Sequence, residues 1–253
     1  THILTYVKEG KMKGLNNRIL RECGAELKFY PGLPLFFKQI KELIENDSNY
    51  KSCDIRLEHY VVSTGFAETI QGSAIAPYVD GIFGCEFIET PAPSGFIAEY
   101  SNSKENEISQ IAIALDNTSK TRYLFEINKG SNKFPETIDV NSFIEPENRR
   151  IPFRNMLYIA DGPSDVPAFS ILNNHQGSTF AIYPKGDSKA FKQVEQLRKD
   201  KRIETFGEAD YSEGTHTWMW LTTRVKEIAD GILKRHKDTL QKSSSVPPGH
   251  LSL

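Results

Sequence analysis

The sequence predicts an α/β protein with a three-layer, Rossmann-like arrangement, in which a mostly parallel sheet carries helices on both faces. Short apolar runs alternate along the chain with segments of helical periodicity. The composition is that of a globular protein, with 38% hydrophobic and 25% charged residues. Ligands of such proteins bind beyond the carboxyl ends of the strands, so the residues that follow each strand are the first candidates for function.

Two helical regions precede the predicted sheet. Residues 3–23 predict two short helices separated by a break, and Gly24 is expected to close the second. A further helix is predicted over residues 34–46, with Pro34 in its first turn. Its apolar residues repeat at helical spacing and predict a core face made of Phe36, Phe37, Ile40, Leu43 and Ile44.

The remaining elements alternate between strand and helix. The predicted strands are 55–62, 82–88, 108–115, 155–160, 179–183 and 202–206. The predicted helices are 67–75, 119–128, 166–172, 188–198 and 216–240, and Asp116 or Thr118 is expected to cap the second of these. Three polar stretches predict irregular structure: a surface loop at 89–107, an irregular segment at 131–152 and a flexible tail at 243–253.

Composition excludes several classes of function. Lysine and arginine total 31 against 33 acidic residues, a net charge of −2, which argues against a nucleic-acid-binding protein. The three cysteines are sparse, which argues against a disulfide scaffold and fits the reducing cytoplasm, and none has the spacing of a zinc site. No apolar run is long enough for a membrane span. We therefore expect a cytoplasmic protein without nucleic-acid or membrane partners.

The first candidate strand end is Ser63-Thr64-Gly65, which is expected between the strand 55–62 and the helix that follows. Hydroxyl groups and backbone N–H groups at the start of a helix can bind an anion. Taken alone, the same residues also fit a serine helix cap followed by a turn glycine.

The second candidate is Asp161-Gly162-Pro163-Ser164-Asp165, a tight turn directly after an apolar strand. Its two carboxylates, Asp161 and Asp165, are ligands suited to a hard cation such as Mg²⁺, which takes one or two protein carboxylates and leaves room for phosphate. The alternative is a turn in which Asp165 caps the next helix. Asp161 is harder to explain structurally, because an unpaired acid beside an apolar strand is costly when buried.

The third candidate is Lys129, which precedes Gly130 at the end of a predicted helix. A cation at this place complements the helix dipole, so a structural role is the simpler interpretation when the residue is considered alone.

In combination, these three motifs resemble the haloacid dehalogenase-like superfamily of phosphatases and related hydrolases. Ser63 resembles its second motif, Lys129 its third and the pair Asp161 and Asp165 its fourth. The Ser63-Thr64-Gly65-Phe66 run is similar to the phosphoserine phosphatase-like branch. The resemblance covers about residues 30–210 and implies a core over 30–242, preceded by a partial helical cap at 1–29.

The resemblance implies a Mg²⁺-dependent phosphatase that hydrolyses a small phosphomonoester through an aspartyl-phosphate. Lys129 and Ser63 would be catalytic, and Ser63, Thr64, Gly65 and Lys129 would bind the phosphoryl group. Asp161 would bind Mg²⁺, and Asp165 would be a second ligand or a support. The substrate and the oligomeric state stay open.

The superfamily's nucleophile motif, Asp-x-Asp-x-Thr, is absent from the 253 residues. Asp116-Asn117-Thr118 has threonine where the second aspartate belongs, and we interpret it as a helix cap. The nucleophilic aspartate is therefore expected upstream of residue 1. The alternative is a non-catalytic phosphate-binding or scaffold protein of the same fold. A phosphotransferase is an enzymatic rival, whereas the acidic pair disfavours a dehalogenase.

Overall fold

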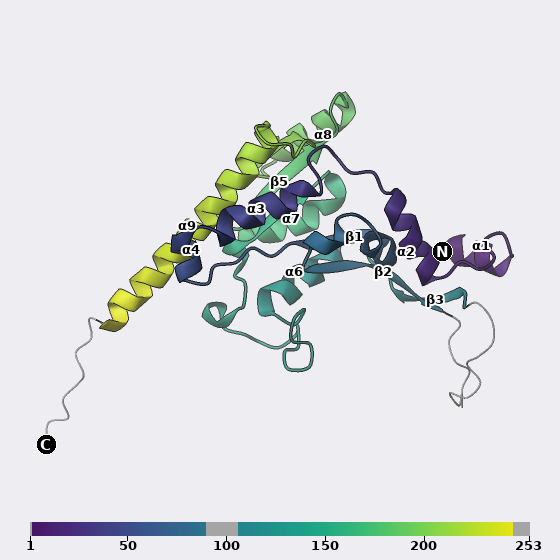
Figure 1. The fold of residues 1–253 in the computed structure, drawn as a ribbon, viewed down its shortest axis with the longest axis horizontal. Coiled ribbons are helices and arrows are strands. Elements are labelled where there is room, and N and C mark those ends of the chain that lie inside the picture. Colours follow the sequence, from purple (N-terminus) through teal and green to yellow (C-terminus); the bar gives the residue numbers. More distant parts are fainter. Residues whose placement is uncertain (1, 90–105, 245–253) are drawn as a thin grey trace, which may run out of the picture. The chain divides into compact units, whose positions relative to one another are not determined.

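The computed structural model describes residues 2–89 and 106–244, which fall into two compact units (Figure 1). Unit 1 comprises residues 1–29 and 59–126, and unit 2 comprises residues 30–58 and 127–253. The described strands form two three-stranded sheets, one in each unit. The prediction of an α/β protein with parallel strands and flanking helices is confirmed.

Unit 1 is built around a mixed sheet. Its strands are β1 (Tyr60–Phe66), β2 (Gly81–Glu89) and β3 (Ile108–Ile113). The central strand β2 pairs parallel to β1 and antiparallel to β3. Its helical elements are α1 (His2–Lys8), α2 (Asn17–Cys23), η1 (Gly24–Glu26), α5 (Ala67–Gln71) and η2 (Ala76–Tyr78). Helix α6 (Lys120–Lys129) begins in unit 1 and ends in unit 2.

The core of unit 1 joins the two N-terminal helices to the sheet. Val7 of α1 and Leu20 of α2 pack with Phe87 of β2 and Ile108 of β3. The two predicted short helices are therefore confirmed, and both bury an apolar side chain against the sheet.

Gly24 follows α2 as predicted, but for a different reason. Its φ of −61° is right-handed, so it is not the left-handed cap that usually favours glycine. A Cβ atom on Gly24 would lie 2.2 Å from the carbonyl oxygen of Thr69 in α5. Glycine is thus required here by the close packing of two helices.

Unit 2 is built around a parallel sheet in the order β4-β5-β6. These strands are β4 (Leu157–Ala160), β5 (Ser178–Tyr183) and β6 (Thr205–Glu208). Its helices are α3 (Leu35–Glu45), α4 (Ser48–Ser52), α7 (Val166–Asn174), α8 (Ser188–Lys199) and α9 (His216–Ser244). The short turns are η4 (Pro146–Asn148), η5 (Phe153–Asn155) and η6 (Pro163–Asp165).

Strand β5 contributes side chains to two separate cores. Phe180 and Ile182 pack with residues of α3 and α9, and Figure 1 shows α9 as the long helix beside α3 and α4. Ala181 packs with Phe169 of α7 and Val194 of α8. Because alternate side chains of a strand point to opposite faces, the two helix groups cover the two faces of this strand. Although α9 has 29 residues, no helix in the described part of the chain is long and apolar enough to cross a membrane.

Several predicted boundaries are corrected. The strand predicted at 55–62 begins only at Tyr60, because Ile55 and Leu57 pack into the core of unit 2 without pairing in a sheet. The helix predicted at 67–75 ends at Gln71. Residues 90–105 of the predicted loop and residues 245–253 of the predicted tail lie outside the described residues.

A buried tyrosine predicts how stability changes at alkaline pH. The Tyr50 hydroxyl donates to Asp230 Oδ1 at 2.7 Å and links α4 to α9. Burial and this hydrogen bond raise the pKa of Tyr50 from 10.0 to about 12. Between these two pH values the native state retains a proton that the unfolded state has lost, so the free energy of unfolding falls as the pH rises.

We expect Tyr50→Phe to flatten this fall, as measured by urea unfolding across the same pH interval. Tyr6→Phe, at an exposed tyrosine, is the matched control. An unchanged pH dependence in Tyr50→Phe would show that the Tyr50 proton is not linked to folding.

Candidate functional site

Ser63, Thr64 and Gly65 lie inside β1, not after it as the sequence predicts. The pairing of β1 with β2 is regular at Val62, which faces Phe83, and resumes with Phe66 facing Cys85. Three residues of β1 therefore stand opposite a single residue of β2 and form a bulge. Bulges redirect side chains and are frequent near active sites.

A hydrogen bond within the bulge fixes the Ser63 side chain. Its Oγ atom accepts a hydrogen bond from the Gly65 backbone N–H at 3.0 Å. The Gly65 N–H, one of the groups expected to bind an anion, is therefore directed at Ser63. The serine hydroxyl keeps its own proton, which can be donated to an external acceptor.

The turn that leads into α6 is held by Asp116, one of the two residues predicted to cap the helix. Asp116 Oδ1 accepts hydrogen bonds from the backbone N–H groups of Thr118 at 2.9 Å and Ser119 at 2.7 Å. The pKa of Asp116 lies below its usual value, mainly because of its hydrogen bonds with Ser119. Asp116 thus caps the turn 117–119 that leads into α6, whereas the sequence predicts a cap on the helix itself.

Lys120, the first residue of α6, is a candidate that the sequence analysis missed. It is only 8% exposed. Lysine is almost never buried to this degree without a functional or electrostatic reason, and the positive end of the helix dipole disfavours a cation at this position. Lysine in the first turn, where acidic residues are usual, is the sequence signal that could have identified it.

Lys129, the lysine that the sequence singles out, is the last residue of α6. Its ammonium group donates to the carbonyl oxygens of Val140 at 2.5 Å and Ser142 at 2.7 Å. Gly130 follows with a φ of +93° and ends the helix as predicted. Two of the three N–H donors of Lys129 are therefore used to hold the irregular segment 131–152, and its phosphate-binding role stays a prediction.

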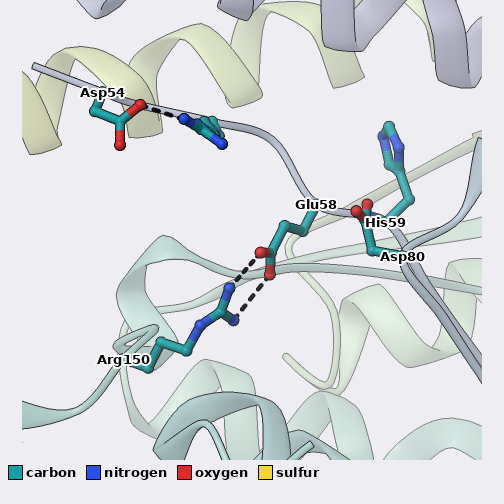
Figure 2. A network of polar contacts seen from close by, with 6 residues as sticks. Asp54, Glu58, His59, Asp80 and Arg150 are labelled. Atoms are coloured by element: carbon teal, nitrogen blue, oxygen red, sulfur yellow. Dashed lines mark hydrogen bonds and ion pairs between the residues drawn. The ribbon is translucent and has the colours of Figure 1, made fainter. Parts of the chain in front are cut away.

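The turn after Gly130 is covered by Arg150, and a Cβ atom on Gly130 would lie 3.0 Å from Arg150 Cδ. Figure 2 shows the Arg150 guanidinium facing the carboxylate of Glu58 in a two-pronged ion pair. Beyond Glu58 the chain enters unit 1, where the His59 N–H donates to Asp80 Oδ2 at 2.8 Å. These contacts fix the chain directly before β1.

Asp161 and Asp165 follow β4 but have different environments. Asp161 is exposed, and its carboxylate makes no hydrogen bond or ion pair with any residue that the structure describes. Asp165 is 3% exposed and accepts hydrogen bonds from the hydroxyls of Tyr158 at 2.7 Å and Ser164 at 2.9 Å. It occupies the N-cap position of α7, as the alternative interpretation predicts, but its side chain makes no capping hydrogen bond there.

The charge of Asp161 contributes to the raised pKa values of two tyrosines, Tyr158 and Tyr211. Burial raises the pKa of Tyr158, and the hydrogen bond to Asp165 and the charges of Asp165 and Asp161 add to this effect. Burial also raises the pKa of Tyr211, again with a contribution from Asp161. Asp161 is therefore close enough to both phenols to oppose their ionisation, and both stay protonated at neutral pH.

The donor set at this turn fits a hard cation that is mostly hydrated. Asp161 offers a carboxylate with free lone pairs, whereas both Asp165 oxygens already accept hydrogen bonds. Within the described residues, no group of three or more histidine, cysteine, aspartate or glutamate side chains could hold a metal ion. A single free carboxylate is sufficient for Mg²⁺, which retains water and binds substrate phosphate.

No family model and no solved structure matches the chain. A protein of Borreliella burgdorferi, described as an uncharacterized protein, is 40% identical over 229 residues. The matched region covers 89% of this chain and 76% of that relative. The chain therefore belongs to the same protein family as this Borreliella burgdorferi protein.

Proposed function

We propose that this protein is a Mg²⁺-dependent phosphomonoester hydrolase of the haloacid dehalogenase-like type. The observation that supports this proposal best is the Asp161 carboxylate. It is exposed directly after a parallel strand and has no partner among the described residues. A buried acid four residues later, Asp165, holds the same turn. A purely structural turn does not need this pair.

The residues of unit 2 have two separate roles in the proposal. Asp161 binds Mg²⁺, which neutralises phosphate charge when it is bound. Asp165 keeps the turn in place through its hydrogen bonds to Tyr158 and Ser164. Asp165 is therefore proposed as a support and not as the second ligand.

The residues of unit 1 bind the phosphoryl group in the proposal. Ser63 donates its hydroxyl proton to a non-bridging oxygen, and the exposed Thr64 contributes a further donor. Lys120, which is only 8% exposed at the start of α6, is proposed beside Lys129 as a candidate for the charge-neutralising lysine, and two of the three N–H donors of Lys129 are bound to carbonyl oxygens.

The proposed fold is a three-layer, Rossmann-like core with a helical cap. The two helix groups on opposite faces of β5 support the three layers in unit 2. The packing of α1 and α2 on β2 and β3 is consistent with a cap remnant at residues 1–29. Free cysteines at positions 23, 53 and 85 are consistent with a cytoplasmic enzyme.

The nucleophile is an aspartate outside the 253 residues, since these contain no Asp-x-Asp-x-Thr sequence. Attack by its carboxylate on phosphorus would displace the alcohol and form an aspartyl-phosphate, which water then hydrolyses. The absence of this motif also supports a second candidate, a phosphate-binding protein of the same fold that does not hydrolyse its ligand.

A panel of small phosphomonoesters tests the proposal on the whole gene product. We expect release of inorganic phosphate that requires Mg²⁺ and stops when EDTA is added. Residues 1–253 alone are expected to hydrolyse no p-nitrophenyl phosphate, and turnover by them would refute the external nucleophile. Phosphate binding by the whole gene product without hydrolysis of any ester would favour the second candidate.

A further inference from the structure

Strand β2 approaches the bulge of β1 very closely at Gly84. A Cβ atom on Gly84 would lie 2.9 Å from the carbonyl oxygen of Gly65, which is closer than real Cβ atoms approach. The absence of a side chain at Gly84 lets the next residue, Cys85, reach the bulge. Cys85 Sγ lies 3.3 Å from the carbonyl oxygen of Thr64.

The Cys85 thiol acts as both donor and acceptor. It donates to Thr64 O and accepts a hydrogen bond from the backbone N–H of Leu115 at 3.3 Å. The Leu115 carbonyl oxygen is more distant, at 3.9 Å, so the single thiol proton is better placed on Thr64. Cys85 thus connects the bulge of β1 to the segment that leads into α6.

This thiol acts on Ser63 through one peptide group. The carbonyl of Thr64 and the N–H of Gly65 belong to the same rigid peptide plane. The carbonyl accepts from Cys85, and the N–H donates to Ser63 Oγ at 3.0 Å. Hydrogen bonds in such a chain strengthen one another. This series of hydrogen bonds ends at the Ser63 hydroxyl, which accepts from Gly65 and can donate its own proton to another acceptor.

We propose that Cys85 is a positioning residue for Ser63. By holding the Thr64–Gly65 peptide from the carbonyl side, the thiol keeps the Gly65 N–H on Ser63 Oγ and so fixes the direction in which Ser63 donates. The inference rests on the proposed function for the identity of the anion, a phosphate group. The coupling between Cys85 and Ser63 does not depend on it.

The first test measures the binding of inorganic phosphate to the whole gene product by calorimetry. We expect Cys85→Ala to weaken binding roughly three- to tenfold, because the variant loses both hydrogen bonds of the thiol, each weaker than an ordinary one, and with them the hold on the Thr64–Gly65 peptide. Cys85→Ser retains a donor and an acceptor and is expected to stay within about twofold of the wild type. Cys53→Ala, at a half-buried cysteine of unit 2, is the matched control. Unchanged phosphate binding in Cys85→Ala would overturn the proposal.

The second test needs no phosphate. Iodoacetamide labels the protein, and mass spectrometry follows the peptide that contains Cys85, with the Cys53 peptide as an internal control. We expect Ser63→Ala to speed the labelling of Cys85 roughly three- to tenfold, because the Gly65 N–H loses its acceptor and the peptide is freed from one side. Equal labelling rates in the two proteins would contradict the coupling. Accelerated labelling in a protein that binds no phosphate would count against the proposed function alone.

Discussion

The Asp161→Asn variant of the whole gene product is expected to lose about 10³-fold in phosphomonoester hydrolysis. A metal ion at a phosphoryl group supplies several kcal/mol of charge stabilisation, and each 1.36 kcal/mol corresponds to a tenfold change in rate. Asparagine keeps the shape of the side chain but removes the negative charge that binds Mg²⁺. Mg²⁺ binding, measured by calorimetry without substrate, should weaken in the same variant.

The stability of this variant should hardly change, since Asp161 is exposed and makes no hydrogen bond or ion pair with the described residues. Asp200→Asn is the matched control, because Asp200 is also exposed and accepts a hydrogen bond from Gln196 that asparagine can retain. Activity of Asp161→Asn within about twofold of the control would reject the metal site and with it the Mg²⁺-dependent mechanism.

Periodicity predicts most elements of the fold because each element buries its own apolar residues. Helix α3 repeats Phe36, Ile40 and Ile44 at helical spacing, and all three are buried in the core of unit 2. The beginning of β1 could not be predicted in this way. Ile55 and Leu57 alternate as strand residues do, yet they pack against the core of unit 2 and not in a sheet.

The spacing of apolar residues in the sequence also cannot predict the direction of a strand or the sheet to which it belongs. The antiparallel pairing of β3 with β2 depends on contacts between residues far apart in sequence, such as Gln110 with Ile88 and Ile108 with Glu89. The apolar spacing of a strand is the same in both orientations. The sequence therefore predicts the strands of both units but not their separation into two sheets.

The sequence predicts the place of some candidate residues better than that of others. Asp161 lies directly after β4, where the sequence predicts it. The sequence could single it out because an acid beside an apolar strand has few structural explanations. Ser63 lies within a bulge that depends on the close approach of Gly84, a contact between residues far apart in sequence. Lys120 has only a weak sequence signal, a lysine in the first turn of a helix, because its burial is a property of the folded chain; a lysine at the end of a helix, such as Lys129, follows a familiar local pattern.

Replacing each of the two lysines of α6 by methionine is expected to affect different properties: catalysis for Lys120 and stability for Lys129. Lys120→Met should lower kcat/KM for phosphomonoesters roughly 10²- to 10³-fold, the effect of removing one preorganised charged donor. Methionine has nearly the same length and is apolar, so the buried space stays filled. Circular dichroism should show that the variant folds.

Lys129→Met should change stability more than catalysis. The variant loses the hydrogen bonds from Lys129 Nζ to Val140 O and Ser142 O, which hold the segment 131–152. Because the side chain is only half-buried, we expect a loss of about 1–2 kcal/mol in the free energy of unfolding. Faster proteolysis within residues 131–152 would accompany it.

The pair of variants separates the two assignments of the charge-neutralising lysine. Loss of activity in Lys120→Met with normal folding, together with an active but less stable Lys129→Met, supports Lys120 as the phosphate-binding cation. An inactive Lys129→Met with unchanged stability would restore the assignment that the sequence favours. Its ammonium would then bind phosphate through the third N–H donor, or would give up a carbonyl oxygen and so release part of the segment 131–152 when substrate binds.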